Sequence, residues 1–392
     1  KKGSRMNIDL ISALIFYALL VLFFLVKRKK FDVQSKIFVL YKTKIGLSLM
    51  DRLSKKIPRL LKVASFIGII VGFLGMIVIL GFLIYGTYQL FTVPDAKPVL
   101  APVFPGIHIP GAPVLSFWHW IIALFVVAGI HEFSHGVISR VYKVDIKSSG
   151  FAFLGPILAA FVEPDEKTLK KKKRVQQLSV FAAGPFSNIL LGVVLLFLVP
   201  LIFNPLINNY FGDGVWVYDV VENSPVGLSG IEIGERIFMV NNVEITNKSD
   251  FSFALDGLKE GDAVKIKTDK KEYDIVAAKD EKKDSGFLGI VINNITDVKE
   301  FKRVLWVLTL FFWLFVITVG VGLFNLLPLG PVDGGRMFYV LLGYFTKDER
   351  KVAKIWGSVA LMIFILILVN MWPYILKLLL FLLKPFMLLF GV

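Results

Sequence analysis

The sequence has no cysteine and only four histidines in 392 residues. The absence of cysteine excludes disulfide bonds and thiolate metal ligands, so any metal site must use histidine, aspartate or glutamate. Charge is also scarce, because 19% of the residues are charged whereas 56% are hydrophobic. Several apolar runs are long enough to cross a bilayer, which excludes an ordinary soluble protein and predicts a polytopic α-helical membrane protein.

Acidic residues are the scarcer charge, with 30 Asp and Glu against 45 Lys and Arg. A basic excess can indicate nucleic-acid binding, but here the cations concentrate in short segments beside apolar runs. The positive-inside rule and attraction to anionic headgroups explain that pattern, so we expect membrane lipids and no nucleic acid as partners. The segments that we place in the cytosol on this rule are 27–30, 140–147, 167–174 and 347–354.

The apolar runs predict about six transmembrane helices. The runs are Ile8–Val26, Leu60–Phe91, Leu115–Ile138, Ser179–Phe203, Leu305–Leu327 and Ile355–Trp372. The basic segment 31–59 lies along the cytosolic membrane surface or forms a solvated linker. Pro373 is expected to end the last helix, and the apolar residues 374–392 lie in the outer interface or cross again. The expected domains are 6–114, 115–203, 204–300, 301–345 and 346–392.

The third apolar run contains His131-Glu132-Phe133-Ser134-His135. Side chains four residues apart share one face of a helix, so both imidazoles can bind a single metal ion. Two neutral imidazoles suit Zn²⁺, and the Glu132 carboxylate beside them can accept a proton from water. A chance match on a buried helix is the alternative, but grouped ionisable side chains are costly in a membrane and indicate function.

A third candidate ligand lies far along the chain. The prolines and glycines of 325–336 prevent a continuous helix and place Asp333 at the cytosolic edge. Aspartate is a natural third ligand for a zinc ion held by two histidines, and the alternative is a turn or N-cap aspartate. Because His131 and His135 lie at the same membrane side, we expect ligation. His108 and His119 lie near the outer end and are interpreted as interfacial residues.

Asn188 lies in the next span, at a depth close to that of His131. An amide in lipid must find partners, so a hydrogen bond between helices is one interpretation and a donor to a substrate carbonyl is the other. The apolar segment 151–162 is too short to span, and Gly150 and Gly155-Pro156 break it. We expect a re-entrant β-hairpin beside the metal site.

Taken together, the metal motif, Gly184-Pro185-Phe186-Ser187-Asn188 and the segment 325–335 resemble the site-2 protease family of intramembrane zinc metalloproteases. The resemblance covers residues 115–345. It implies that His131, His135 and Asp333 hold one zinc ion, that Glu132 activates a zinc-bound water and that Asn188 binds substrate backbone. The hairpin residues Gly150 and Phe151, together with Asn325, are further substrate-binding candidates.

Residues 204–300 differ from the rest of the chain, with charge, turns and short β-like runs. They predict an extracytosolic α+β domain of ordinary size. The segments 224–230, 233–237 and 240–243 are similar to bacterial-type PDZ domains. That resemblance implies a strand and loop that capture an extended peptide, and the candidate residues are Phe287, Leu288, Gly289 and Ile290.

The predicted function is intramembrane proteolysis of single-span transmembrane proteins in the cell membrane. The active site is expected near the cytosolic face, and the PDZ-like domain filters or binds substrates. One alternative is a metal transporter or channel, which predicts more ionisable residues along several spans than the sequence contains. The other is a non-catalytic PDZ scaffold, against which the intact Glu132 argues.

Overall fold

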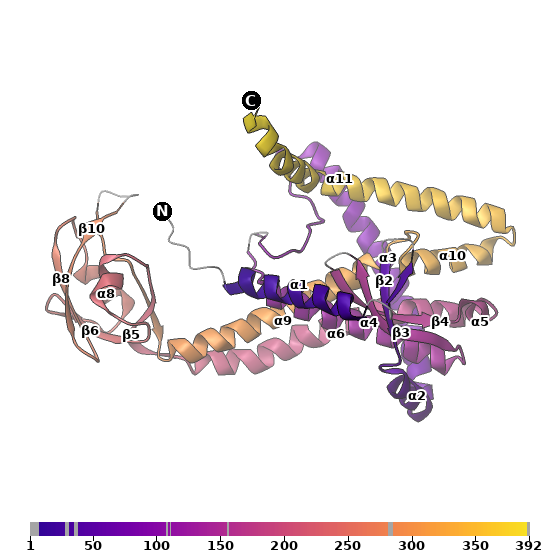
Figure 1. The fold of residues 1–392 in the computed structure, drawn as a ribbon, viewed down its shortest axis with the longest axis horizontal. Helices are drawn as coiled ribbons and strands as arrows, with labels where there is room; N and C mark the ends of the chain where they lie inside the picture. Colours follow the sequence, from indigo (N-terminus) through magenta and orange to yellow (C-terminus); the bar gives the residue numbers. More distant parts are fainter. Residues whose placement is uncertain are drawn as a thin grey trace. The chain divides into compact units, whose positions relative to one another are not determined.

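The computed structural model describes residues 8–27, 31–34, 38–106, 109, 111–154, 157–280 and 285–389. The chain divides into two compact units, which we call the helical unit (Lys1–Leu195 with Phe312–Val392) and the β-rich unit (Leu196–Phe311). It passes between them within α6 (Arg174–Asn208) and α9 (Val298–Phe324). Figure 1 follows the elements along the chain.

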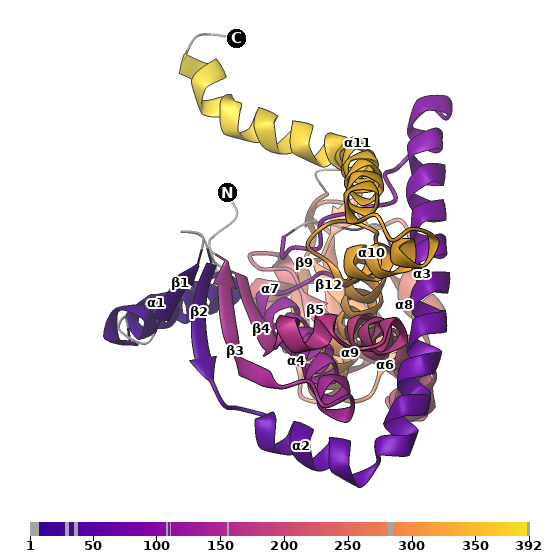
Figure 2. The same ribbon diagram turned by 90° about the vertical axis from the view of Figure 1, so that its right-hand side faces the viewer.

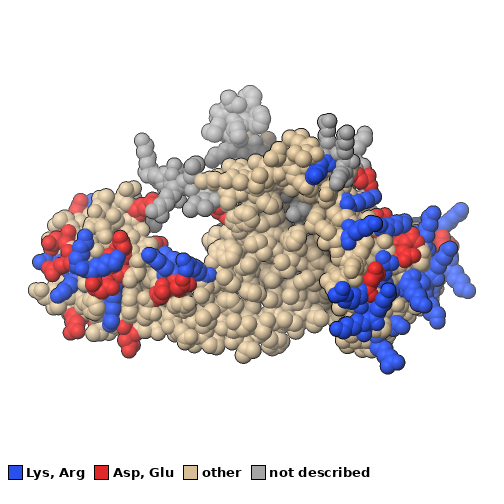
Figure 3. Space-filling model, turned by 60° about the horizontal axis from the view of Figure 1, so that its bottom comes forward, with Lys and Arg blue, Asp and Glu red and all other residues tan. Residues whose placement is uncertain are grey.

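Six helices in the described part of the chain are long and apolar enough to cross a membrane, which confirms the predicted number. They are α1 (Ile8–Lys27), α3 (Pro58–Thr92), α4 (Phe117–Val141), α6, α9 and α11 (Glu349–Leu389). Large apolar side chains such as Leu14, Ile77 and Leu361 stay exposed on them. In Figure 3, uncharged residues cover the body of the helical unit and Lys and Arg gather at one end. Such a surface suits lipid contact.

The last helix corrects one prediction. The sequence predicts a helix end at Pro373, but α11 continues to Leu389. The prediction is wrong because a proline removes only one backbone hydrogen bond, which apolar helices tolerate. Figure 2 shows that α11 changes direction along its length, as helices do at an internal proline. The predicted basic residues Arg28–Lys30, the interfacial His108 and the Gly155-Pro156 break lie outside the described residues.

A four-stranded antiparallel sheet packs against α4 in the helical unit. Its order is β1 (Phe31–Gln34), β2 (Phe38–Thr43), β3 (Ile146–Leu154) and β4 (Ile157–Pro164). The predicted hairpin corresponds to β3 and β4, whereas the sequence does not predict β1 and β2. Aromatic contacts join the two pairs of strands, with ring centroids of Phe31 and Phe153 6.0 Å apart.

The position of each strand decides what it can bind. β3 lies inside the sheet, with both neighbours paired along its length, and Gly150 opposes Lys42 on one side and Phe161 on the other. A Cβ atom at Gly150 would lie 2.1 Å from the Tyr41 carbonyl oxygen, so glycine is needed there for strand packing. β4 is an outer strand, and its far side faces α4.

Among the described residues, three short helices complete the helical unit. They are α2 (Leu47–Lys56), α5 (Glu166–Lys170) and α10 (Asp333–Phe345). α2 packs against α4, where Met50 is buried and its side chain fills the space that Gly136 leaves open. The glycine on α4 therefore allows α2 to pack closely against the helix that carries the histidines.

The β-rich unit has a main sheet of order β12-β5-β6-β8-β9, with β7 paired to β6 and a separate β10–β11 pair. Its elements are β5 (Phe211–Val220), α7 (Pro225–Ser229), β6 (Arg236–Val240), β7 (Val243–Glu244), α8 (Lys248–Ala254), β8 (Ala263–Thr268), β9 (Glu272–Val276), β10 (Ala278–Lys279), β11 (Gly286–Phe287) and β12 (Ile290–Ile295). Buried and exposed residues alternate along β8, as in a strand with one face on a core. Val215, Ile237 and Ile266 lie at the centre of that core.

Candidate metal centre

The two histidines of the motif come together as their spacing requires. α4 carries His131 and His135 one turn apart, and both side chains are buried. Their Nε2 atoms lie 3.2 Å apart, so both rings point the same nitrogen toward one centre.

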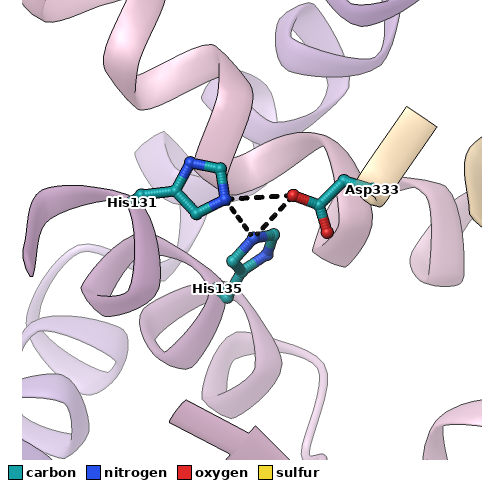
Figure 4. A group of neighbouring side chains, drawn as sticks. All are labelled: His131, His135 and Asp333. Atoms are coloured by element: carbon teal, nitrogen blue, oxygen red, sulfur yellow. Dashed lines mark hydrogen bonds and ion pairs between the residues drawn. The ribbon is translucent and has the colours of Figure 1, made fainter. Parts of the chain in front are cut away.

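Asp333 completes this group from another part of the chain. α9 ends at Phe324, an irregular segment follows, and α10 begins at Asp333. The Asp333 Oδ2 atom lies 3.0 Å from His131 Nε2 and 3.2 Å from His135 Nε2 (Figure 4). The N-cap residue of α10 is Val332 and Asp333 is the first residue of the helix, so the N-cap alternative is wrong.

Two glycines explain how Asp333 reaches the histidines. A Cβ atom at Gly334 would lie 2.2 Å from the backbone of Leu326, and one at Gly335 would lie 2.0 Å from the Leu329 carbonyl oxygen. The Gly334 N–H also donates to the Asn325 carbonyl at 2.7 Å. The first turn of α10 is therefore packed tightly onto the segment that follows α9.

α6 supplies a partner to the other nitrogen of each ring. The Val180 carbonyl lies 2.7 Å from His135 Nδ1, and because a carbonyl can only accept, Nδ1 carries the proton. The Asn188 amide lies 3.1 Å from His131 Nδ1. With its proton on Nδ1, neutral His135 turns the lone pair of Nε2 toward the Asp333 carboxylate. Two acceptor atoms then face each other unless a cation or a further proton lies between them.

Gly184 leaves open the space in which these atoms meet. A Cβ atom there would lie 2.3 Å from His135 Nε2 and 2.5 Å from His131 Nε2. The three donor atoms are separated by 3.0 to 3.2 Å. Tetrahedral zinc with bonds of about 2.1 Å separates its ligand atoms by about 3.4 Å, so the group fits zinc with small adjustments.

Glu132 lines the same cavity as the three ligands but is not one of them. Its carboxylate accepts a hydrogen bond from the Val162 N–H of β4 at 2.9 Å, and its side chain is half-buried. The carboxylate is not a member of the His131–His135–Asp333 group. It is therefore free of the metal position and available for proton transfer.

A cavity of about 780 Å³ opens onto the centre. The three ligands and Glu132 line one part of it, and residues 161–164 of β4 line another. Asn325, Pro331, Val332 and Arg336 contribute the segment around Asp333. The cavity thus brings the ligands, the candidate base and a strand edge to one space.

The other predicted site residues differ in their position relative to the cavity. Asn325 lines the cavity, whereas Gly150, Phe151 and the fully buried Asn188 do not. Their roles in substrate binding stay predictions. His119 lies in the first turn of α4, hydrogen-bonded to Ser116, and is not part of the metal-binding group.

The PDZ peptide-binding candidates lie together in the β-rich unit. Phe287 ends β11, Ile290 begins β12, and the two residues between them accept backbone hydrogen bonds. The Val226 N–H donates to the Leu288 carbonyl at 3.0 Å and the Val221 N–H to the Gly289 carbonyl at 2.8 Å. The loop is hydrogen-bonded to α7 and to the residue that follows β5, and its capture of peptides stays a prediction.

Sequence reasoning missed two functional contacts, the Val180 carbonyl on His135 and the Val162 N–H on Glu132. Both are backbone groups, which any residue type supplies, so composition gives no signal for them. Gly184 did carry a signal, because it stands in the motif around Asn188, but its contact with the histidines depends on the approach of α6 to α4.

The six spans and the buried ligand group define a multi-pass membrane protein with a candidate metal centre. The model of Peptidase family M50 matches residues 119–368, so the chain belongs to Peptidase family M50, the site-2 protease family. The match includes all three candidate ligands and Glu132. Protease activity follows from membership of this family.

Two relatives illustrate what the chain is similar to. An uncharacterized protein of Methanocaldococcus jannaschii is 28% identical over 312 residues, which is 76% of each chain. A Clostridium acetobutylicum protein named "Putative zinc metalloprotease" is 26% identical over 184 residues, 39% of this chain and 50% of that protein. The name of the second relative agrees with the match to a peptidase family.

Proposed function

We propose that the chain is an intramembrane zinc endopeptidase that cleaves transmembrane-helix substrates. The observation that carries this proposal is the convergence of His131, His135 and Asp333 beside Glu132 at one cavity. Membership of Peptidase family M50 supports peptide-bond hydrolysis, and the six apolar helices support a site within a membrane.

The proposed chemistry divides among the residues at the cavity. His131, His135 and Asp333 would hold the zinc ion, which when bound polarises a carbonyl and makes water easier to deprotonate. Glu132 would accept the water proton and return it to the leaving amine. The Val180 carbonyl holds the His135 ring so that Nε2 keeps its lone pair.

We assign a matching role to Asn188. Its amide nitrogen lies 3.1 Å from His131 Nδ1, and its oxygen has no hydrogen-bond partner among the described residues. Turning the amide by 180° presents that oxygen to Nδ1–H, which is the tautomer that leaves His131 Nε2 available to metal. The Thr318 hydroxyl of α9 donates a hydrogen bond to the backbone carbonyl of Asn188 at 3.2 Å and helps to fix the position of α6.

The edge of β4 supports an extended substrate. The Val162 N–H donates to Glu132 and therefore points away from β3 toward the cavity. A transmembrane helix must unfold locally before cleavage because its carbonyls are already hydrogen-bonded, and an outer strand can hold the unfolded segment by backbone pairing. A substrate carbonyl that takes the Val162 N–H would release the Glu132 carboxylate for catalysis.

The remaining parts of the proposal concern orientation and selection. Arg140, Lys143 and Lys147 follow the histidines on the chain, which supports a cytosolic active site and a re-entrant hairpin near it. The β-rich unit would then be extracytosolic. Its resemblance to PDZ domains supports a role in excluding bulky substrates or binding a freed carboxyl end.

The test is reconstitution of the full chain in vesicles with a single-span substrate. We expect cleavage that a zinc chelator abolishes and that Glu132→Gln lowers by about 10²–10⁴-fold while zinc content is unchanged. The control is Glu163→Gln, which changes a neighbouring carboxylate that also lines the cavity. Ion flux without cleavage would support a transporter instead, and peptide binding without cleavage would support a scaffold.

A further inference from the structure

A second cavity, of about 610 Å³, lies next to the metal centre in the helical unit. Cations outnumber carboxylates in its wall by four to two. The cations are Lys170, Arg174, Arg336 and Lys347, and the carboxylates are Glu166 and Glu349. The proposed protease chemistry uses none of these side chains. The positive-inside rule accounts for their side of the membrane and does not account for their convergence on one cavity.

Three of these four cations have no ion-pair partner in the described part of the chain. Within the described ranges, no carboxylate oxygen lies within 4.0 Å of the charged atoms of Lys170, Arg174 or Lys347. Arg336 reaches Glu166 only at 3.9 Å, and both side chains are about half exposed. Such a pair is worth little in water. A cavity with this excess of unpaired positive charge favours an anionic ligand.

The cavity also has a prepared shape. The Arg174 guanidinium lies over the Tyr344 ring, 4.8 Å from its centroid, and a Cβ atom at Gly343 would lie 3.3 Å from that guanidinium. The Trp356 indole is held by a 2.9 Å hydrogen bond to the Gly335 carbonyl. A planar guanidinium placed in this way can contact two oxygens of one phosphoryl group.

We propose that this cavity binds the phosphoryl headgroup of an anionic membrane lipid. Two candidate spans begin at its wall, α6 at Arg174 and α11 at Glu349, so the cavity lies where spans end and headgroups are found. Its volume exceeds that of a bare phosphate, which leaves room for the glycerol part of a headgroup. A soluble phosphate ester has the same chemistry, and the experiment below separates the two sources.

This ligand would lie close to the catalytic parts. The two cavities share the lining residues Glu166, Leu169, Phe181 and Arg336. Arg336 is one helical turn from Asp333, and Phe181 follows the residue whose carbonyl holds His135. Headgroup binding therefore stabilises the ends of α6 and α10 that position the metal ligands, and this last step rests on the proposed function.

The test is native mass spectrometry of the full chain in neutral detergent with added phosphatidylglycerol or phosphatidylcholine. The cavity variant is Arg174→Gln with Lys347→Gln, and the matched control is Lys171→Gln with Lys173→Gln, which removes the same charge from residues outside both cavities. We expect the cavity variant alone to lose phosphatidylglycerol retention by about tenfold or more, because each cation near a headgroup contributes to its binding.

Unchanged retention in the cavity variant, or an equal loss in both variants, would overturn the proposal. Glycerol 1-phosphate is the soluble probe, and if it displaces the lipid at equal concentration, the lipid source is wrong. All arms use the Glu132→Gln background, so lipid retention is measured without protease activity. If Glu132→Gln retains the lipid but the unchanged chain never cleaves the single-span substrate in vesicles, the proposed function is overturned and this site stands.

Discussion

Buried ionisable side chains occur in both units. The two groups differ in whether the surrounding protein supplies all their hydrogen-bond partners. In the β-rich unit, Glu235 is 1% exposed, and it accepts hydrogen bonds from the Tyr273 hydroxyl, the Thr268 hydroxyl and the Glu232 N–H. In the helical unit, the Nε2 atoms of His131 and His135 and the Oδ2 atom of Asp333 lie 3.0 to 3.2 Å from one another. Their outer partners on α6 already fix the rings.

The difference separates structure from function. A buried carboxylate with a full set of donors stabilises a fold, because its charge is solvated by the protein. Two imidazole nitrogens and a carboxylate oxygen that converge on one point form a ligand set that a cation completes. Burial alone therefore does not separate the two groups, and the convergence of three ligand atoms on one point identifies the candidate metal centre.

The largest effect that we expect comes from Gly184→Ala. The added methyl would lie 2.3 Å from His135 Nε2 and would displace the rings from the metal position. Zinc content should fall to near zero and proteolysis with it, measured by elemental analysis of purified protein. The control is Gly129→Ala on α4, where a Cβ atom meets nothing within 4 Å. Normal zinc content in Gly184→Ala would contradict the proposed ligand arrangement.

A smaller effect is expected when the outer partner of His131 is changed. Asn188→Leu removes the acceptor for Nδ1–H and should weaken zinc binding by about 10–100-fold. Asn188→Asp keeps an acceptor and should keep zinc, as measured by competition with a chelator of known affinity. If both variants bind zinc like the unchanged chain, Asn188 does not orient His131, and contact with substrate remains its predicted role.

Changes to the hydrogen-bonded cluster around Glu235 in the β-rich unit should alter the stability of that unit and leave the zinc content unchanged. Glu235→Leu leaves the buried Tyr273 hydroxyl without its acceptor, which costs about 1–3 kcal/mol. Amide hydrogen exchange in β6, β8 and β9 should speed up accordingly, whereas Glu244→Leu at the exposed β7 should change little. Unchanged exchange in Glu235→Leu would show that the cluster does not stabilise this unit.

The smallest expected effect is a pH dependence at the same cluster. Burial, together with the hydrogen bond to Glu235, raises the pKa of Tyr273 to about 12. An unfolded tyrosine has a pKa of about 10, so between these values the unfolded chain loses its proton first and folding becomes less favourable as pH rises. The urea midpoint of the β-rich unit should fall from pH 10 to 12, and Tyr273→Phe should flatten this slope. An equal slope in both proteins would contradict the assignment.

The sequence predicts the parts of this fold that depend on local pattern. The length and apolar character of six runs predict the spans, and the spacing of His131 and His135 predicts a shared face. The irregular segment before Asp333 is predicted by its prolines and glycines, and the structure shows α9 ending at Phe324. These features follow from backbone chemistry and helical periodicity.

The parts that the sequence does not predict depend on distant contacts. β2 pairs with β3, which lies more than a hundred residues further along the chain, and β1 pairs with β2. Without that distant partner, the basic sequence around them is typical of a segment on the membrane surface. Pro373 lies within α11, although a proline is typical of a helix end. The residues around Pro373 do not show that an apolar helix tolerates the loss of one backbone hydrogen bond. The Val162 N–H reaches Glu132 only because β4 packs against α4.

The most direct test of the central claim is the zinc content of the full chain before and after Asp333→Ala. The account predicts one zinc ion per chain in the unchanged protein and almost none in the variant, because two imidazoles alone do not make a three-ligand site. Equal zinc in both proteins would show that Asp333 does not bind the ion and would contradict the proposed centre.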